Sequence, residues 1–112
     1  MKNGVFLGVA LLLGVLMARA DEPRRLELVA NDGVFTPTEI TMTAGEKIIL
    51  DVRNAGKEAE EFESAELKRE KIVPPGKTVS IPLGPLKAGT YPFFGEFHPK
   101  TARGRVIVTE AK

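Results

Sequence analysis

Residues 89–99 read Gly89-Thr90-Tyr91-Pro92-Phe93-Phe94-Gly95-Glu96-Phe97-His98-Pro99, and this stretch carries the strongest fold signal in the chain. The aromatic run predicts a strand at 91–97, and the apolar Val106-Ile107-Val108 predicts a closing strand at 105–109. Tyr91 begins its strand just after a corner, which predicts a tyrosine corner whose hydroxyl bonds back to the connecting backbone. His98, the only histidine in the chain, is thereby placed in a loop between two strands.

The first twenty residues predict a secretory signal peptide rather than part of the fold. Lys2 supplies a positive start, residues 5–17 are apolar, and Ala18-Arg19-Ala20 forms a small-x-small cleavage site. The apolar run is short for a membrane span. We therefore expect residues 1–20 to be removed after Ala20, leaving one domain at 21–112 that is exported to a bacterial periplasm.

The composition of the expected mature domain excludes several classes of function. Without Lys2 and Arg19, the 16 basic residues fall to 14 against 15 acidic ones, so the net charge becomes −1. This balance gives no support for nucleic-acid or membrane-surface binding. The chain has no cysteine and hence no disulfide. Neither Ser64 nor Ser80, the only serines, lies in a nucleophile motif, and nothing indicates an organic small-molecule substrate.

Alternation of apolar and polar residues dominates the rest of the domain. It predicts strands around Leu28, Met42, Leu50 and Ile81, separated by turns rich in glycine and proline. Residues 57–71 are instead highly charged, and there we expect a short helix or an irregular loop at 64–67. Short strands with no long helix predict an all-β, antiparallel Greek-key sandwich.

This pattern resembles the cupredoxin superfamily across the expected mature chain. The copper loop of that family reads Tyr-x-Phe-x-Cys-x-x-His before a glycine and a final strand, and Tyr91, Phe93, His98 and Gly104 fall in step with it. Three further segments are similar to a subfamily found with bacterial ferrous-iron uptake: Glu60-Glu61-Phe62-Glu63, Pro74-Pro75-Gly76 and Phe97-His98-Pro99. The resemblance implies that iron is oxidised or handled before transport, with an iron permease or a periplasmic iron-binding protein as partner.

The sequence departs from the blue-copper pattern at the ligands themselves. A blue-copper centre needs two histidines and a cysteine. Gly95 stands at the cysteine position, Glu60 or Glu61 replaces the first histidine, and only His98 remains. We therefore expect no type 1 copper and no electron transfer through it, while ferroxidase activity is left open.

The resemblance brings residues 58–63 beside residues 95–104 at one end of the sandwich. The pool of metal ligands that it implies is His98, Glu60, Glu61, Glu63, Glu66 and Glu96. Imidazole with carboxylates suits iron, manganese or zinc better than copper(I). Three alternatives stay open: the glutamates are only a solvated charged face, the protein is a metal-free module that docks on the permease or an iron-binding partner, or it binds copper(II).

Overall fold

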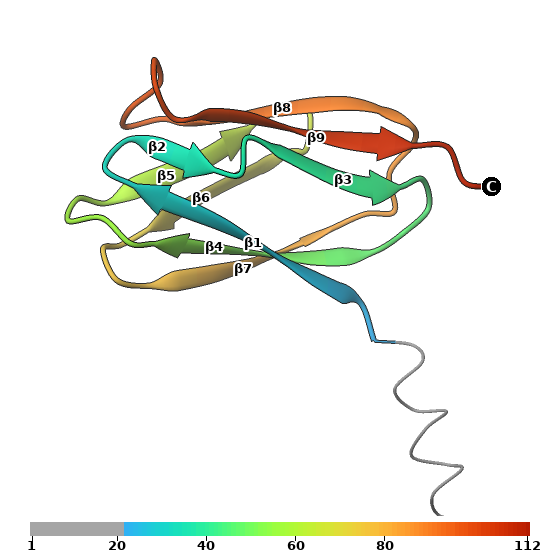
Figure 1. The fold of residues 1–112 in the computed structure, drawn as a ribbon, viewed down its shortest axis with the longest axis horizontal. Helices are drawn as coiled ribbons and strands as arrows, with labels where there is room; N and C mark the ends of the chain where they lie inside the picture. Colours follow the sequence, from blue (N-terminus) through green and yellow to red (C-terminus); the bar gives the residue numbers. More distant parts are fainter. Residues whose placement is uncertain (1–21) are drawn as a thin grey trace, which may run out of the picture.

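The structure is a computed structural model that describes residues 22–112. The expected signal peptide lies outside these residues. Two β-sheets pack face to face (Figure 1). The strands are β1 (Arg24–Asn31), β2 (Val34–Thr36), β3 (Glu39–Thr43), β4 (Ile48–Asn54), β5 (Glu60–Ser64), β6 (Arg69–Val73), β7 (Thr78–Leu83), β8 (Gly89–Gly95) and β9 (Arg103–Thr109).

The chain crosses repeatedly between a sheet of order β2-β1-β4-β7 and a sheet of order β3-β9-β8-β5-β6. The predicted all-β sandwich is confirmed, and no helix occurs among residues 22–112. The sheets are mixed rather than purely antiparallel, because β1 pairs with β4 and β3 with β9 in parallel. Alternation could not reveal this, since both kinds of pairing have a side-chain period of two. No helix in the described part of the chain is long and apolar enough to cross a membrane.

The core forms where the inward rows of the two sheets meet. In β4, Ile48, Leu50 and Val52 are buried, as the alternation predicts. Phe35, Phe62 and Phe93 cluster at its centre, with ring centroids 5.1 to 6.3 Å apart. Such aromatic contacts add about 0.5–1.5 kcal/mol per pair beyond the area that they bury.

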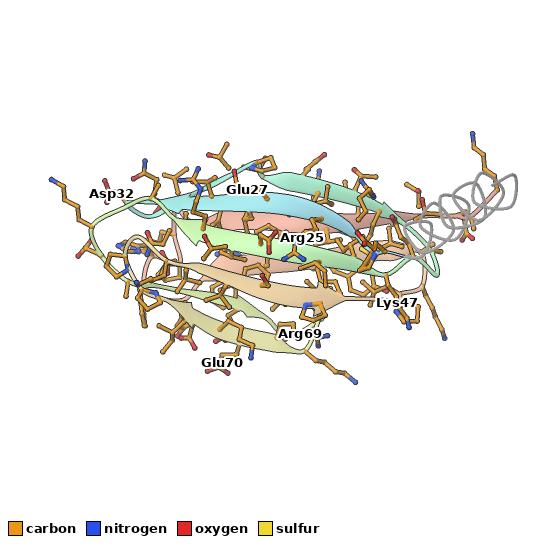
Figure 2. The ribbon with its side chains drawn as sticks, turned by 90° about the horizontal axis from the view of Figure 1, so that it is seen from below. Arg25, Glu27, Asp32, Lys47, Arg69 and Glu70 are labelled. Carbon is orange, nitrogen blue, oxygen red and sulfur yellow. The ribbon has the colours of Figure 1, made fainter. Side chains whose placement is uncertain are left out.

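The outward row of the first sheet is charged. Arg25 forms an ion pair with Asp51, and Glu27 with Arg53, across the parallel β1–β4 ladder. Each pair is diagonal, because the register sets Arg25 opposite Ile49 and Glu27 opposite Asp51. Arg25 and Glu27 point away from the core on this face (Figure 2). The polar residues that alternate with the apolar row of β4 therefore face outward.

The tyrosine corner is also confirmed, because the Tyr91 hydroxyl donates to the carbonyl of Lys87 at 2.8 Å. The charged stretch 57–71 contains a turn at 65–68, close to the irregular loop expected at 64–67, but strands that were not predicted flank it. The stretch forms the antiparallel hairpin β5–β6, joined by a turn that includes Lys68 at a φ of 57°. Phe62 anchors this hairpin because it is fully buried between charged neighbours.

The β1–β2, β4–β5 and β8–β9 connections lie at the same end of the sandwich as the β6–β7 turn (Figure 1). Side-chain contacts bind them together. Thr101 of the β8–β9 loop donates its hydroxyl to the Gly33 carbonyl in the β1–β2 turn. The Lys57 backbone N–H donates to Asp32 at 3.3 Å. His98 lies at this end.

Candidate metal centre

A buried carboxylate and the only histidine form the centre of this end. Nδ1 of His98 lies 2.6 Å from Oε2 of Glu60. The other oxygen, Oε1, accepts the backbone N–H groups of Glu61 and Phe97, each at 3.0 Å. Glu60 is 4% exposed. Because a carboxylate can only accept hydrogen bonds, Nδ1 carries the proton and the Glu60 carboxylate is fully satisfied.

Gly95 makes room for that carboxylate. A β-carbon at position 95 would lie 2.5 Å from Cδ of Glu60 and 2.8 Å from the Ala102 side chain. A side chain at this position would therefore overlap the carboxyl group. The space beside the position that the resemblance assigns to the copper thiolate is occupied by Glu60.

The second ring nitrogen of His98 faces outward. Nε2 lies 3.4 Å from Oε1 of Glu58, and the imidazole is 28% exposed. The hydrogen bond with Glu60, and more weakly the contact with Glu58, raise the pKa of His98 above its usual value against a smaller opposing effect of burial. When the ring is neutral, the Glu60 bond fixes the proton on Nδ1 and leaves the lone pair on Nε2.

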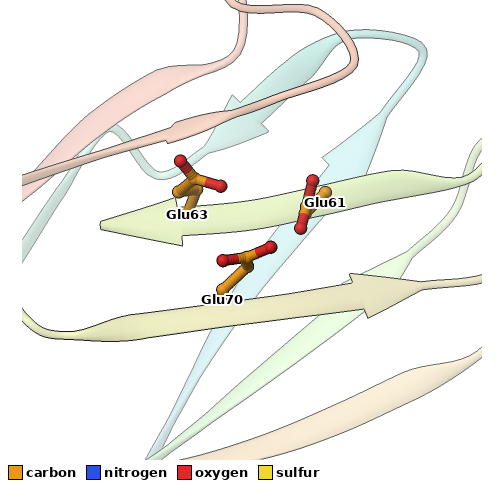
Figure 3. Close-up of side chains that lie close together, drawn as sticks. All are labelled: Glu61, Glu63 and Glu70. Carbon is orange, nitrogen blue, oxygen red and sulfur yellow. The ribbon is translucent and has the colours of Figure 1, made fainter. Parts of the chain in front are cut away.

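A second acidic group lies on the opposite face of β5. Glu60 and Phe62 point inward, so Glu61 and Glu63 point outward, and the latter pairs in register with Glu70 of β6. One carboxylate oxygen from each of Glu61, Glu63 and Glu70 lies within 4.8 Å of the others (Figure 3).

Hydrogen bonding, burial and electrostatic repulsion act together in this group, which we call the outer carboxylate cluster (Glu61, Glu63 and Glu70). A shared hydrogen bond with Glu70, then burial and the neighbouring negative charges, raise the pKa of Glu61 to about 7. Burial and the charges of Glu96 and Glu70 also raise the pKa of Glu63.

The six predicted ligands therefore do not form a single site. Glu60 and His98 meet at the end of the sandwich, whereas Glu61 and Glu63 belong to the outer carboxylate cluster. The Glu96 backbone N–H donates to the Glu61 carbonyl. The negative charge of the Glu96 side chain, at the start of the loop, helps to raise the pKa of Glu61. Glu66 lies exposed in the β5–β6 turn and belongs to neither group.

Two residues of interest, Glu58 and Glu70, were absent from the predicted pool. Glu58 lies two residues before Glu60, a spacing that carries no signal by itself. Glu70 could have been found only by recognising 57–71 as a hairpin, because the register of β5 and β6 places it opposite Glu63.

These donors do not fit type 1 copper. That centre requires a thiolate and two imidazoles. The chain has no cysteine and one histidine, and the Glu60 carboxyl fills the space beside position 95. Nitrogen and carboxylate oxygen donors remain, which suit iron, zinc, manganese or copper(II).

Comparisons with known proteins agree with this architecture. The family model described as a cupredoxin-like domain matches residues 4–108. An uncharacterised protein of Rickettsia prowazekii is 41% identical over 90 residues, which span 80% of this chain and 72% of that protein.

Similar solved structures include two copper proteins. Auracyanin A, a blue copper protein of Chloroflexus aurantiacus, aligns at 16% identity over 79% of this chain and 100% of its own, with a TM-score of 0.66. The metal-binding domain of a Cu(I)-exporting P-type ATPase of Streptococcus pneumoniae aligns at 18% identity over 77% of this chain and 85% of its own, with a TM-score of 0.68. At these identities the likeness concerns the fold alone.

Proposed function

The chain belongs to the cupredoxin-like domain family, and we propose that it is an exported protein that binds ferrous iron at the His98 end of the sandwich for iron uptake. The signal-peptide pattern at 1–20 supports export to the periplasm. The similarity of Glu60-Glu61-Phe62-Glu63 and Phe97-His98-Pro99 to the iron-uptake subfamily supports the pathway.

The observation that carries this proposal is the 2.6 Å bond between Glu60 and Nδ1 of His98. Metal-binding histidines usually donate their second ring N–H to a carboxylate, which fixes the tautomer and makes the ligating nitrogen more basic. Glu60 therefore positions the ring and does not itself bind the metal. Nε2 is the ligating atom.

Glu58 supplies the second ligand. Metal–ligand bonds of about 2.1 Å place neighbouring ligand atoms about 3 Å apart, and Nε2 lies 3.4 Å from Oε1 of Glu58. Glu58 is exposed and can adjust, and water completes the coordination. Two protein ligands at the surface favour weak, reversible binding, which suits a protein that passes its metal on.

Iron is favoured over copper(I) by the donor chemistry. Copper(I) prefers thiolate and thioether ligands, and Met42, the only methionine among residues 22–112, is buried in the core. Copper(II) is the competing ion, because it binds imidazole well. We propose binding and not oxidation, since iron oxidation needs an electron acceptor that the chain's own side chains do not provide.

A partner would receive the metal at this end. Phe97, next to His98, is 48% exposed and offers an apolar contact for an iron permease or an iron-binding protein. If the protein is instead a metal-free docking module, Phe97 would be needed for docking on the partner, whereas His98 would not.

An anaerobic titration of the purified protein with ferrous iron, read by competition with a chromogenic chelator, tests the proposal. We expect wild type to bind ferrous iron at one site. The affinity of that site should fall at least tenfold in His98→Ala and about 10–100-fold in Glu60→Gln, the usual range for losing a positioning partner. Glu66→Gln, an exposed glutamate outside both groups, is the matched control. Equal affinity in wild type and His98→Ala would reject the site, and stronger copper(II) binding through the same residues would assign it to copper.

A further inference from the structure

The β1–β2 turn, formed by Asp32 and Gly33, lies against the imidazole of His98. A β-carbon at position 33 would be 3.0 Å from Cδ2 and 3.1 Å from Cγ of His98, and 3.1 Å from Oγ1 of Thr101. These distances are shorter than ordinary van der Waals contacts, so only the glycine backbone fits beside the carbon side of the ring. Glu60 bonds the other side of the ring through Nδ1. The imidazole is therefore held between a carboxylate and a piece of backbone.

The second contact restricts the ring where the hydrogen bond alone would not. The terminal torsion of a histidine side chain is soft, so a bond at Nδ1 leaves the ring free to swing about that bond. The Gly33 backbone on the Cγ–Cδ2 side limits this motion. A ring turned over about its Cβ–Cγ bond would present a carbon to the buried Glu60 carboxylate, which would lose its partner. The orientation that remains directs Nε2 to within 3.4 Å of Oε1 of Glu58.

Thr101 holds the turn in this position. Its hydroxyl donates to the carbonyl of Gly33. Thr101 is also tied to His98 itself, because its backbone N–H donates to the His98 carbonyl at 3.2 Å. One hydroxyl thus connects the loop that carries the imidazole to the backbone that packs against it.

The turn bridges the two segments that carry the candidate ligands. On one side Thr101 joins it to the loop of His98, and on the other side Asp32 accepts the backbone N–H of Lys57, next to Glu58, at 3.3 Å. The strand that follows the turn gives it little further support, since β2 has three residues and lies at the edge of its sheet. The position of the turn therefore depends on these two side-chain contacts.

We propose that Thr101 is a positioning residue of the His98 site, because its bond to Gly33 keeps the β1–β2 turn against the imidazole and directs Nε2 toward Glu58. The value of this arrangement for metal binding rests on the proposed iron site. Ligands that are oriented before the metal arrives lose less conformational freedom when it binds, so binding is tighter. The orientation of the ring, however, is a property of the metal-free protein and can be measured without iron.

Thr101→Val is the deciding variant, because valine keeps the shape of threonine and removes the hydroxyl. Thr101 is exposed, so the change leaves the core intact. Long-range proton–nitrogen correlation spectra of the metal-free protein follow both ring nitrogens of the only histidine at a pH where the ring is neutral. Wild type should show one tautomer, with a protonated Nδ1 and an unprotonated Nε2. In Thr101→Val the shifts of the two nitrogens should move toward each other as the ring exchanges between tautomers.

Iron binding gives a second readout of the same variant. The affinity for ferrous iron should fall about tenfold in Thr101→Val, at the lower end of the range for losing a partner that positions a ligand. Thr101→Ser keeps the hydroxyl and should return both readouts to wild type. Thr109→Val is the matched control, because Thr109 also donates its hydroxyl to a backbone carbonyl, that of Met42 at 3.4 Å, but at the far end of β9.

The ring signals decide the positioning role. Nitrogen shifts that are the same in Thr101→Val as in wild type overturn it, and so does an equal change in Thr109→Val, which would show a general loosening of the fold. The two proposals also fail separately. A wild-type protein that binds no ferrous iron rejects the iron site, whereas the spectra of the metal-free variants still support or reject the role of Thr101.

Discussion

A β-carbon on Gly95 would lie 2.5 Å from the carboxyl carbon of Glu60, so the two residues share a space that only a glycine leaves open. This relationship explains why the β8–β9 loop keeps the framework residues of a copper loop while a carboxylate takes the place of the copper ligands. The carboxylate takes up the room beside position 95 and holds His98 through Nδ1.

Gly95→Ala is expected to destabilise the protein by about 1–3 kcal/mol, the usual cost of forcing an extra carbon into a packed site. The methyl group meets both Glu60 and Ala102. Urea denaturation measures the loss. In a Glu60→Ala background the same substitution should cost less, but still something, because Ala102 remains 2.8 Å away. An equal cost in both backgrounds would show that Glu60 does not fill this space.

His98 should titrate above its usual pKa of about 6.5, because protonation strengthens its bond with Glu60. The resulting stabilisation is fully present below the unfolded pKa and is lost as the pH rises through the folded one. Proton NMR can follow the ring directly, since the chain has a single histidine. Glu60→Gln should lower the pKa of His98 markedly, and Glu58→Gln should lower it less. The reverse order would assign the main interaction to Glu58.

The sandwich itself could be predicted because its core strands obey a simple rule. Ile48, Leu50 and Val52 alternate with polar residues, and burial follows that alternation. The corner at Tyr91 has its own local signature. The hairpin at 57–71 gave no comparable signal, because charged residues occupy both faces of β5 and only Phe62 marks the inward row.

The site was harder to predict for the same reason. The sequence alone does not show which of Glu60 and Glu61 points inward. Nor does it show which residue binds a metal and which only positions a ligand. Only the strand direction of β5 decides that one enters the interior and its neighbour faces outward. Glu70 joins the cluster through cross-strand register, which depends on the turn after Ser64.

Tyr91→Phe is expected to lower stability by about 1 kcal/mol, the usual contribution of one hydrogen bond. The substitution removes only the hydroxyl that donates to Lys87, and the ring stays in place. Thermal unfolding measures the change, while iron binding should be unaffected because the corner lies away from the His98 end. A melting curve that coincides with that of wild type would show that the corner contributes nothing to stability.

Glu61→Gln should stabilise the metal-free protein at alkaline pH but not at acidic pH. The folded-state pKa of Glu61 is raised to about 7 by Glu70, burial and the other carboxylates, whereas the reference value is 4.5. Between these values the folded protein retains a proton that the unfolded chain has released, so stability falls as the pH rises through this window and then levels off. Glutamine carries no such charge. Denaturation midpoints measured with chelator present should therefore coincide for the two proteins near pH 4.5 and diverge up to about pH 7. A difference in midpoint that stays the same from pH 4.5 to pH 7 would show that the folded protein does not hold this proton more tightly than the unfolded chain.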